Sequence, residues 1–218
     1  GLLTILILTT LVSVNSQAEN CTTNDLGDRT CTTSTAGTTT GNVLTNSTFG
    51  TGSTYSTSGW TISGDVGHGH TSTTGSTQSG QNTSGGVLAF EGDPSGSIYQ
   101  DVDLVGDGHL TQSQINEGFT STQSADVWFW NSIPQNVIMK QTLIDDNGVS
   151  ITQQRQIDGS CTTFNGCSYD TYTDTIIVGG NSQQDYEITA RFEFNESSNS
   201  TAHYGADLRN PSLTVSYY

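Results

Sequence analysis

Positive charge is scarce in this sequence. Its 218 residues include five Lys and Arg residues against 21 Asp and Glu residues, which gives a formal net charge of −16 at pH 7. Proteins that bind nucleic acids place clusters of basic residues against the phosphates, so this balance excludes a nucleic-acid partner. The same charge opposes binding to an anionic membrane surface.

Signatures of common catalytic sites are also lacking. The sequence contains no Gly-x-Ser-x-Gly nucleophile elbow and no His-Glu-x-x-His zinc helix. The pairs Asp101 with Asp103 and Asp145 with Asp146 are carboxylates of the kind that a glycosidase uses, but that chemistry needs two carboxyl groups facing one cleft. We therefore expect a protein that is not an enzyme, and a hydrolase is the alternative.

Long apolar runs are missing except at the start of the chain. Residues 2–14 are apolar and uncharged, and Ser16-Gln17-Ala18 follows with small residues at both ends. This pattern is typical of a secretory signal peptide, and the run is short for a membrane span. We predict a signal peptide over residues 1–18 and a secreted, extracellular mature chain without a membrane anchor. An uncleaved membrane tether is the alternative.

Cysteine residues are few, and their number is even. Four Cys residues follow the predicted cleavage site: Cys21, Cys31, Cys161 and Cys167. An even count in an exported protein predicts two disulfides, and the close spacing favours Cys21–Cys31 and Cys161–Cys167 among three possible connectivities. Zinc binding is the alternative, although neither pair has the two-residue spacing of a zinc knuckle.

Alternating hydrophobicity indicates an all-β protein. In residues 186–194, Tyr186, Ile188, Ala190, Phe192 and Phe194 fall on one face of a predicted strand, and polar residues fall on the other. Residues 213–217 alternate in the same way. The turn Asp145-Asp146-Asn147-Gly148 predicts a hairpin between strands over 137–144 and 149–157, with the positive φ angles of a type I′ turn.

One short helix is predicted near Thr111 to Glu117. Thr111 can cap it, Gln114 completes a capping box, and Gly118 can end it. Residues 19–41 are rich in Thr and are interpreted as an N-terminal arm. Residues 42–218 then form one β-sandwich domain of about nine to eleven strands in two sheets.

Several short motifs occur in a recognisable order. Val43-Leu44-Thr45-Asn46-Ser47-Thr48-Phe49 precedes Gly59-Trp60, and the segments Ser97–Val102, Ala125–Trp130 and Ala206–Val215 follow. This order resembles that of lectin-like jelly-roll carbohydrate-binding modules, which have a galactose-binding-like β-sandwich fold. The resemblance implies an antiparallel jelly-roll β-sandwich, Phe49 and Trp60 in its core, and a secreted, non-catalytic glycan-binding or adhesion function.

The resemblance also implies a structural calcium ion. The family's calcium site uses an acidic residue after the first-strand Phe and a carboxylate before the last strand. Here Gly50 stands at the first position, Asp207 matches the second, and Glu91 and Asp93 lie where a loop can add oxygen ligands. The alternative is that Asp207 caps a turn and that Glu91 and Asp93 are solvated.

The aromatic strand offers candidate ligand-binding residues. Ala125, Val127 and Phe129 are the natural core face, which places Trp128 and Trp130 on the opposite face. If the strands are neighbours, these rings lie near Gln141, Gln153 and Arg155 of the hairpin. Flat aromatic faces and planar hydrogen-bonding groups are what sugar rings require. The alternative is that both Trp side chains are buried in a two-sided sheet.

A second function class remains open. The Thr-rich arm is able to add a strand to the sheet edge of a neighbouring molecule. The sequence therefore also permits a structural or assembly protein of a cell surface, filament or virion, with self-association through the arm. A solvent-open Trp pair favours glycan binding, and a buried pair favours assembly.

Overall fold

The computed structural model describes residues 19–23, 29–33, 37–51, 54–64, 66–68, 88–90, 95–129, 135–160, 169–180, 185–196 and 206–217. The predicted signal peptide and the pair Cys161 and Cys167 lie outside these residues. Among the described residues, no helix has the length and apolar character that a membrane crossing requires.

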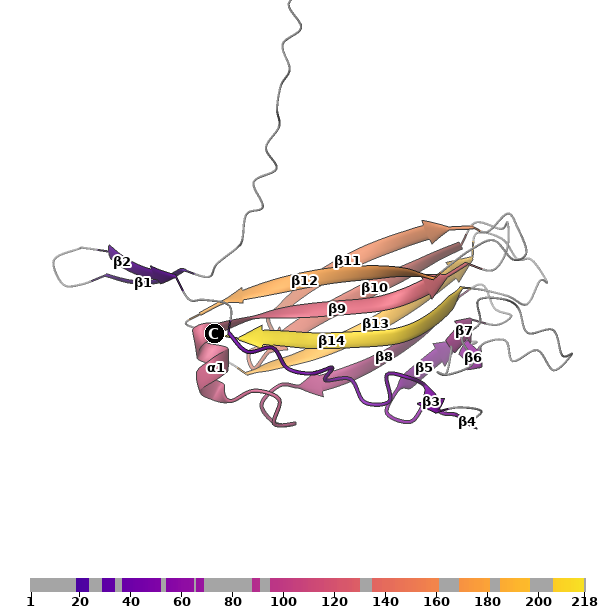
Figure 1. Ribbon diagram of the computed structural model, residues 1–218, viewed down its shortest axis with the longest axis horizontal. Helices are drawn as coiled ribbons and strands as arrows, with labels where there is room; N and C mark the ends of the chain where they lie inside the picture. Colours follow the sequence, from indigo (N-terminus) through magenta and orange to yellow (C-terminus); the bar gives the residue numbers. More distant parts are fainter. Residues whose placement is uncertain are drawn as a thin grey trace, which may run out of the picture.

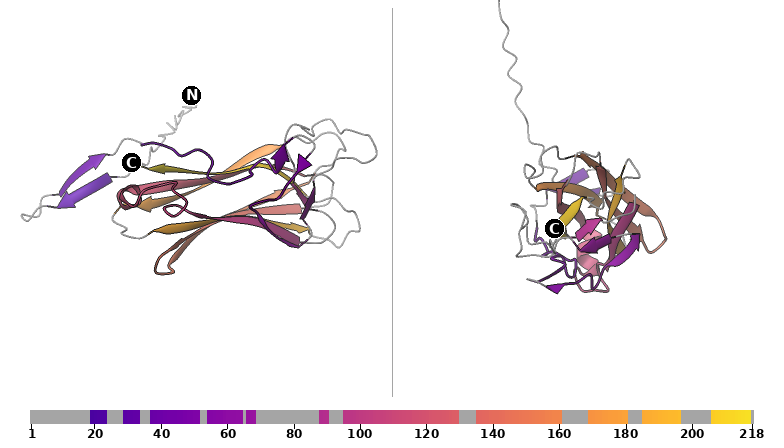
Figure 2. Two further views of the ribbon diagram at one scale, coloured as in Figure 1. Left: turned by 90° about the horizontal axis from the view of Figure 1, so that it is seen from below. Right: turned by 90° about the vertical axis from the view of Figure 1, so that its right-hand side faces the viewer.

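Two five-stranded antiparallel sheets form a sandwich (Figures 1 and 2). The first sheet has the order β11 (Ser150–Gly159), β10 (Gln135–Asp145), β13 (Tyr186–Glu196), β8 (Ser95–Asp103) and β5 (Thr61–Gly64). The second sheet has the order β12 (Asp170–Gly179), β9 (Gly118–Trp128), β14 (Asp207–Tyr217), β7 (Leu88–Phe90) and β6 (Val66–His68). The predicted antiparallel jelly-roll β-sandwich with one short helix is confirmed.

Two small hairpins complete the strands that the structure describes. β1 (Glu19–Thr23) pairs with β2 (Arg29–Thr33), and β3 (Gly50–Thr51) pairs with β4 (Thr54–Tyr55). β3 and β4 lie at the end of the sandwich opposite the helix and the last residues of β14 (Figure 1). In β1 and β2 the register places Cys21 directly opposite Cys31.

Part of the predicted arm is built into the second sheet. Thr40 N donates to Val215 O at 2.8 Å, and Tyr217 N donates to Thr38 O at 3.0 Å. Thr39 also forms an antiparallel bridge with Ser216. Residues 38–40 therefore extend along β14.

The predicted helix is confirmed as α1 (Gln112–Glu117). Gln114 N donates to Thr111 Oγ1 at 3.3 Å, and Thr111 N donates to Gln114 Oε1 at 2.7 Å, which completes the capping box. Gly118, with φ +96°, ends the helix and begins β9.

The predicted hairpin is confirmed, but its turn type is different. Gly148 has a positive φ of 76°, whereas Asn147 does not adopt a positive φ. Gly148 N donates to Asp145 O at 2.8 Å, and the Asp145 carboxylate accepts from Asn147 N and Val149 N. The loop is thus a type I turn followed by a left-handed glycine. The Asp145 side chain favours this turn over type I′ because it bonds the backbone of the loop.

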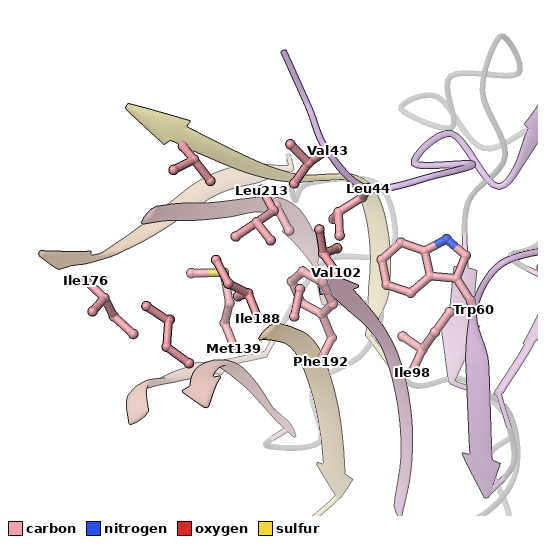
Figure 3. Packing of buried hydrophobic residues seen from close by; sticks show 14 of the residues in the cluster. Val43, Leu44, Trp60, Ile98, Val102, Met139, Ile176, Ile188, Phe192 and Leu213 are labelled. Atoms are coloured by element: carbon pink, nitrogen blue, oxygen red, sulfur yellow. The ribbon is translucent and has the colours of Figure 1, made fainter. Parts of the chain in front are cut away.

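The core lies between the two sheets (Figure 3). Its labelled side chains come from β12 and β14 on one side and from β8, β10 and β13 on the other, and Val43, Leu44 and Trp60 from outside these strands lie beside them. Phe49 is fully buried and its ring centroid lies 5.4 Å from that of Trp60. The prediction that Phe49 and Trp60 are core residues is confirmed.

A buried amide ties the first segment of the sandwich to β8. Gln100 Nε2 donates to Thr45 O at 3.2 Å and to Gly59 O at 2.9 Å, while Gln100 Oε1 accepts from Thr45 N at 2.7 Å. Nearby, Trp60 Nε1 donates to Asn46 O at 3.2 Å. These bonds satisfy backbone groups of Thr45, Asn46 and Gly59, which lie outside regular strand pairing.

Candidate functional site

The structure separates the predicted ligand-binding residues. Trp128 points away from the core of the second sheet, whereas Gln141 belongs to the first sheet and is fully buried between the sheets. Arg155 lies on the edge strand β11, where it donates to Thr173 O at 3.1 Å and covers the Tyr172 ring at 5.3 Å. Trp130 lies outside the described residues. β9 and β10 are in different sheets, so the condition that the strands are neighbours is not met.

Trp128 belongs to an outer-surface cluster of β9, β12 and β14. Its ring centroid lies 6.1 Å from that of Tyr169, and its exposed fraction is 8%. The Arg209 guanidinium lies 3.6 Å from the centroid of the Tyr169 ring. The predicted alternation of this strand is confirmed, because Ala125, Val127 and Phe129 are buried on the core side. Neighbouring side chains nevertheless cover Trp128 on the outside, so this member of the predicted Trp pair is buried, which is the outcome expected for an assembly role and does not favour glycan binding at Trp128.

Asp126 is the charged centre of this cluster. It accepts from Thr171 Oγ1 at 2.6 Å, from Asn210 Nδ2 at 2.9 Å and from Arg209 Nε at 3.3 Å. Burial by itself raises the pKa of Asp126, but the bonds from Thr171 and Asn210 and the Arg209 charge outweigh it and hold the pKa below its ordinary value. The ionised carboxylate thus fixes the cluster and is unsuited to donate a proton.

A broader polar surface covers the outer face of the first sheet. The strand register aligns one row of residues across all five strands: Thr61, Tyr99, Arg191, Lys140 and Gln154. A second row lies two residues along the strands: Asp101, Thr189, Thr142 and Thr152. We call these nine residues the Tyr99 face. Because neighbouring strands are about 4.8 Å apart, the first row spans about 19 Å.

The side chains of the Tyr99 face contact one another and are partly open to solvent. Arg191 Cζ lies 4.4 Å from the centroid of the Tyr99 ring, and Arg191 Nη1 lies 3.4 Å from Glu193 Oε1. Thr189 Oγ1 donates to Asp101 Oδ1 at 2.5 Å. In contrast to Trp128, Tyr99 is half-buried, and the Arg191 side chain keeps 34% of its exposure.

Charge on the Tyr99 face is balanced once the neighbouring Glu193 is included. Arg191 and Lys140 lie directly opposite each other, and the carboxylates of Asp101 and Glu193 flank them. The whole chain, by contrast, carries a net charge of −16. The face thus combines an aromatic ring with hydroxyl, amide, guanidinium and carboxylate groups, and its charges cancel when the adjacent Glu193 is counted with it.

The Tyr99 face was missed at the sequence level. Alternation in 186–194 already placed Thr189 and Arg191 on the polar side of their strand. The same alternation separates Tyr99 and Asp101 from the buried Ile98 and Gln100. What the sequence could not supply is the register that sets β8, β13 and β10 side by side.

An acidic cavity of about 190 Å³ lies elsewhere, at one end of the first sheet. It is lined by Asp103, Ile144, Asp145, Asp146, Asp185, Tyr186 and Glu187. The pKa of Asp185 is raised by burial and by the charges of Asp103 and Asp146. Two of the carboxylates accept hydrogen bonds from the backbone. Asp103 accepts from Val105 N and Gly106 N, and Asp146 accepts from Asp185 N. This cluster stabilises turns.

The predicted calcium ligands are only partly described. Asp207 is the first residue of β14, where it pairs with Ala89 and Trp128 in the sheet, while Glu91 and Asp93 lie outside the described residues. Within the part of the chain that the structure describes, no group of three His, Cys, Asp or Glu residues is arranged to hold a metal ion. Calcium binding stays a prediction.

No protein-family model and no curated protein sequence matches this chain. Solved structures with a similar strand arrangement include TmCBM61 in complex with β-1,4-galactotriose, at 14% identity and a TM-score of 0.39, over 79% of this chain and 97% of that one. Another is the CBM22-1 xylan-binding domain of Paenibacillus barcinonensis Xyn10C, at 14% identity and a TM-score of 0.42, over 84% and 97% of the two chains.

A further similar structure is the enzymatically active domain of tailspike protein 4 from bacteriophage CBA120, at 14% identity and a TM-score of 0.45. The match covers 79% of this chain and 21% of the tailspike chain, so this chain spans about a fifth of its length. At these identities the likeness is one of fold. The carbohydrate-binding modules among these structures share the β-sandwich architecture.

Proposed function

We propose that this protein is a secreted, non-catalytic module that binds a neutral glycan on the Tyr99 face. The observation that carries the proposal is the row in which the Tyr99 ring lies between Thr61 and Arg191 across three strands. Sugar rings are bound by an aromatic surface together with planar or hydroxyl groups that bond adjacent hydroxyls. The Tyr99 face supplies both on rigid strands.

The length of the face favours a chain of several sugars. The row extends over about 19 Å from β5 to β11, and the second row, of Asp101 and the three Thr residues, runs alongside it. An oligosaccharide lying across the strands can contact both rows. A single sugar would use only the part around Tyr99.

Charge favours a neutral ligand. A polyanionic glycan would be repelled by the net charge of −16, whereas the local balance around Arg191 and Lys140 neither repels nor requires an anion. Neutral glucan, xylan and galactan oligosaccharides are therefore the probes of choice.

A titration of these oligosaccharides into the mature protein tests the proposal. We expect Tyr99→Ala to weaken binding by at least about tenfold, which corresponds to about 1.4 kcal/mol. Tyr99→Phe keeps the ring and should retain most of the affinity. Ile177→Ala changes an exposed residue of the second sheet and serves as the matched control, with unchanged affinity expected.

Two results would contradict the proposed site. If Tyr99→Ala binds as tightly as the parent while Trp128→Ala loses binding, the ligand lies at the Trp128 cluster. If no neutral glycan binds a well-folded sample, glycan binding at this face is wrong.

An assembly role is the second candidate. β1 and β2 pair only with each other among the described strands, which leaves the outer edges of this hairpin available to another sheet. Light scattering that shows a defined oligomer, lost on removal of residues 19–36, supports this role. A monomer at all concentrations contradicts it.

A further inference from the structure

A strip of buried polar side chains crosses the core between the two sheets. Ser121 and Gln123 of β9 and Gln141 of β10 are all fully buried. Ser121 Oγ donates to Gln141 Oε1 at 2.9 Å, and Gln141 Nε2 donates to Asp174 O at 3.1 Å. Gln123 Nε2 reaches across the sandwich to Arg191 O at 3.3 Å. These bonds join both sheets from the inside.

Two oxygen atoms of this strip have no hydrogen-bond donor. Among the residues that the structure describes, Gln123 Oε1 and Asp174 Oδ2 are both buried and both without a partner. The two residues are directly opposite each other in the pairing of β9 with β12, and both side chains face the interior. Two buried acceptors without a donor on directly paired residues are costly, because each has lost its water.

We infer that the Asp174 carboxyl group takes up a proton and donates it to Gln123 Oε1, which closes the polar strip. A protonated carboxyl group has one O–H donor, and the amide oxygen is an acceptor. One proton therefore satisfies both orphaned oxygens. When the proton leaves, both acceptors are again without a donor.

The charges around Asp174 agree with this arrangement. Burial raises the pKa of Asp174, and the Arg155 guanidinium on β11 lowers it by less, so the pKa lies above its ordinary value. The facing side chains of β9 and β10, namely Ser121, Gln123 and Gln141, are uncharged. Arg155 is thus the one charged group that opposes protonation within the described residues.

Asp174 lies where a change in its protonation would affect the edge of the sandwich. β11 and β12 are edge strands of opposite sheets and are not paired with each other. Arg155 bridges them by donating to Thr173 O at 3.1 Å, next to Asp174. The protonated pair holds β12 against β9, whereas an ionised Asp174 is drawn toward Arg155. The stability of β12 at this edge of the sandwich therefore depends on the protonation of Asp174.

The sign of the pH dependence follows from the raised pKa. The folded state binds the proton more tightly than the unfolded chain, whose Asp pKa is about 3.9. The stabilisation is therefore complete below that value and is lost as the pH rises through the higher folded pKa. Asp174→Asn, whose amide can donate to Gln123 Oε1 at any pH, should lack this loss.

Thermal melts of the parent protein and of Asp174→Asn from pH 4 to pH 8 test the inferred hydrogen bond from Asp174 to Gln123. We expect the variant to have the higher Tm at pH 8 and the difference to vanish toward pH 4. Asp170→Asn, an exposed carboxylate on the same strand, is the matched control and should show no such convergence. An Asp174→Asn variant that is less stable than the parent at pH 8 would overturn the inference.

A carboxyl-carbon NMR titration provides an independent readout. We expect Asp174 to titrate above its ordinary pKa in the parent and at a lower pH in Gln123→Met, which removes the acceptor at similar volume. Titration of Asp174 at or below the ordinary value in the parent would mean that a bridging water or Arg155, not a proton, serves these oxygens, and the inference would be wrong.

Discussion

At the scale of single residues, polar side chains of this protein add contacts beyond the backbone bonds of the sheets. Gln100 joins Thr45 and Gly59, which lie outside the strands, to β8, and Asp126 joins β9 to the side chains of Thr171, Arg209 and Asn210 on the two strands that pair with it. A buried polar group that loses its partner keeps the full cost of its lost water. Single substitutions at these positions should therefore have large effects.

Gln100→Glu should destabilise the fold by about 2–4 kcal/mol at neutral pH, because a carboxylate cannot donate to Thr45 O and Gly59 O. Urea unfolding measures this. Gln154→Glu, an exposed residue with the same chemical change, is the control and should stay within about 0.5 kcal/mol of the parent. Equal effects of the two variants would show that the three Gln100 bonds contribute little.

Asp126→Asn should destabilise the protein at pH 7 and much less in acid. The pKa of Asp126 is below its ordinary value in the folded state, so its stabilisation is present above the unfolded pKa and lost as the pH falls through the folded pKa. Unfolding at pH 7 and pH 3 should show the gap between parent and variant narrowing. A gap that is equal at both pH values would contradict an ionised Asp126 in the cluster.

At the scale of elements, the sequence predicted local structure well wherever the decisive contacts are local. The Thr111–Gln114 capping box defines α1, and the alternation in 186–194 defines the buried face of β13. The prediction of the hairpin was correct, but the prediction of its turn type was wrong. The Asp145 carboxylate stabilises a different turn by accepting hydrogen bonds from the loop backbone, and hydrophobic alternation carries no information about such bonds. The turn type thus depends on side-chain hydrogen bonds within the loop, which the pattern of apolar and polar residues does not reveal.

Close packing of two glycines fixes the junction of α1, β9 and β12. A Cβ atom on Gly118 would lie 2.7 Å from Gly180 N and 2.9 Å from Val178 O, at a φ of +96°. We expect Gly118→Ala to cost about 2–4 kcal/mol in unfolding free energy. At Gly179 no atom lies within 4 Å of the added methyl, so Gly179→Ala should be neutral or slightly stabilising. Similar losses in both variants would contradict the steric explanation.

The β1–β2 hairpin gives the predicted Cys21–Cys31 disulfide a geometric basis. Directly opposite residues in an antiparallel pair have Cα atoms about 4.5–5.5 Å apart, which a disulfide can span. Peptide mapping without reductant should link Cys21 to Cys31, and the bridge should stabilise the hairpin by about 2–3 kcal/mol. A link from Cys21 to Cys161 or Cys167 would show that the bridges connect distant segments.

At the scale of the whole molecule, the sequence predicted the sandwich but not the arrangement of its surfaces. Residues far apart in the chain, such as Thr61, Tyr99 and Arg191, meet only because the sheet order brings β5, β8 and β13 together. For the same reason Trp128 and Gln141, expected near each other, lie on different sheets. The pattern within one strand shows which residues are polar, but it does not show which residues of other strands lie beside them.

The central claim is that the Tyr99 face binds a neutral glycan, and a map of backbone amide chemical shifts tests it most directly. The neutral oligosaccharide that raises the Tm most is titrated into the ¹⁵N-labelled protein. The account predicts that the largest shifts fall on β8, β13 and β10, around Tyr99, Arg191 and Lys140. Shifts confined to β9, β12 and β14 around Trp128, or no shifts with any neutral glycan, would contradict it.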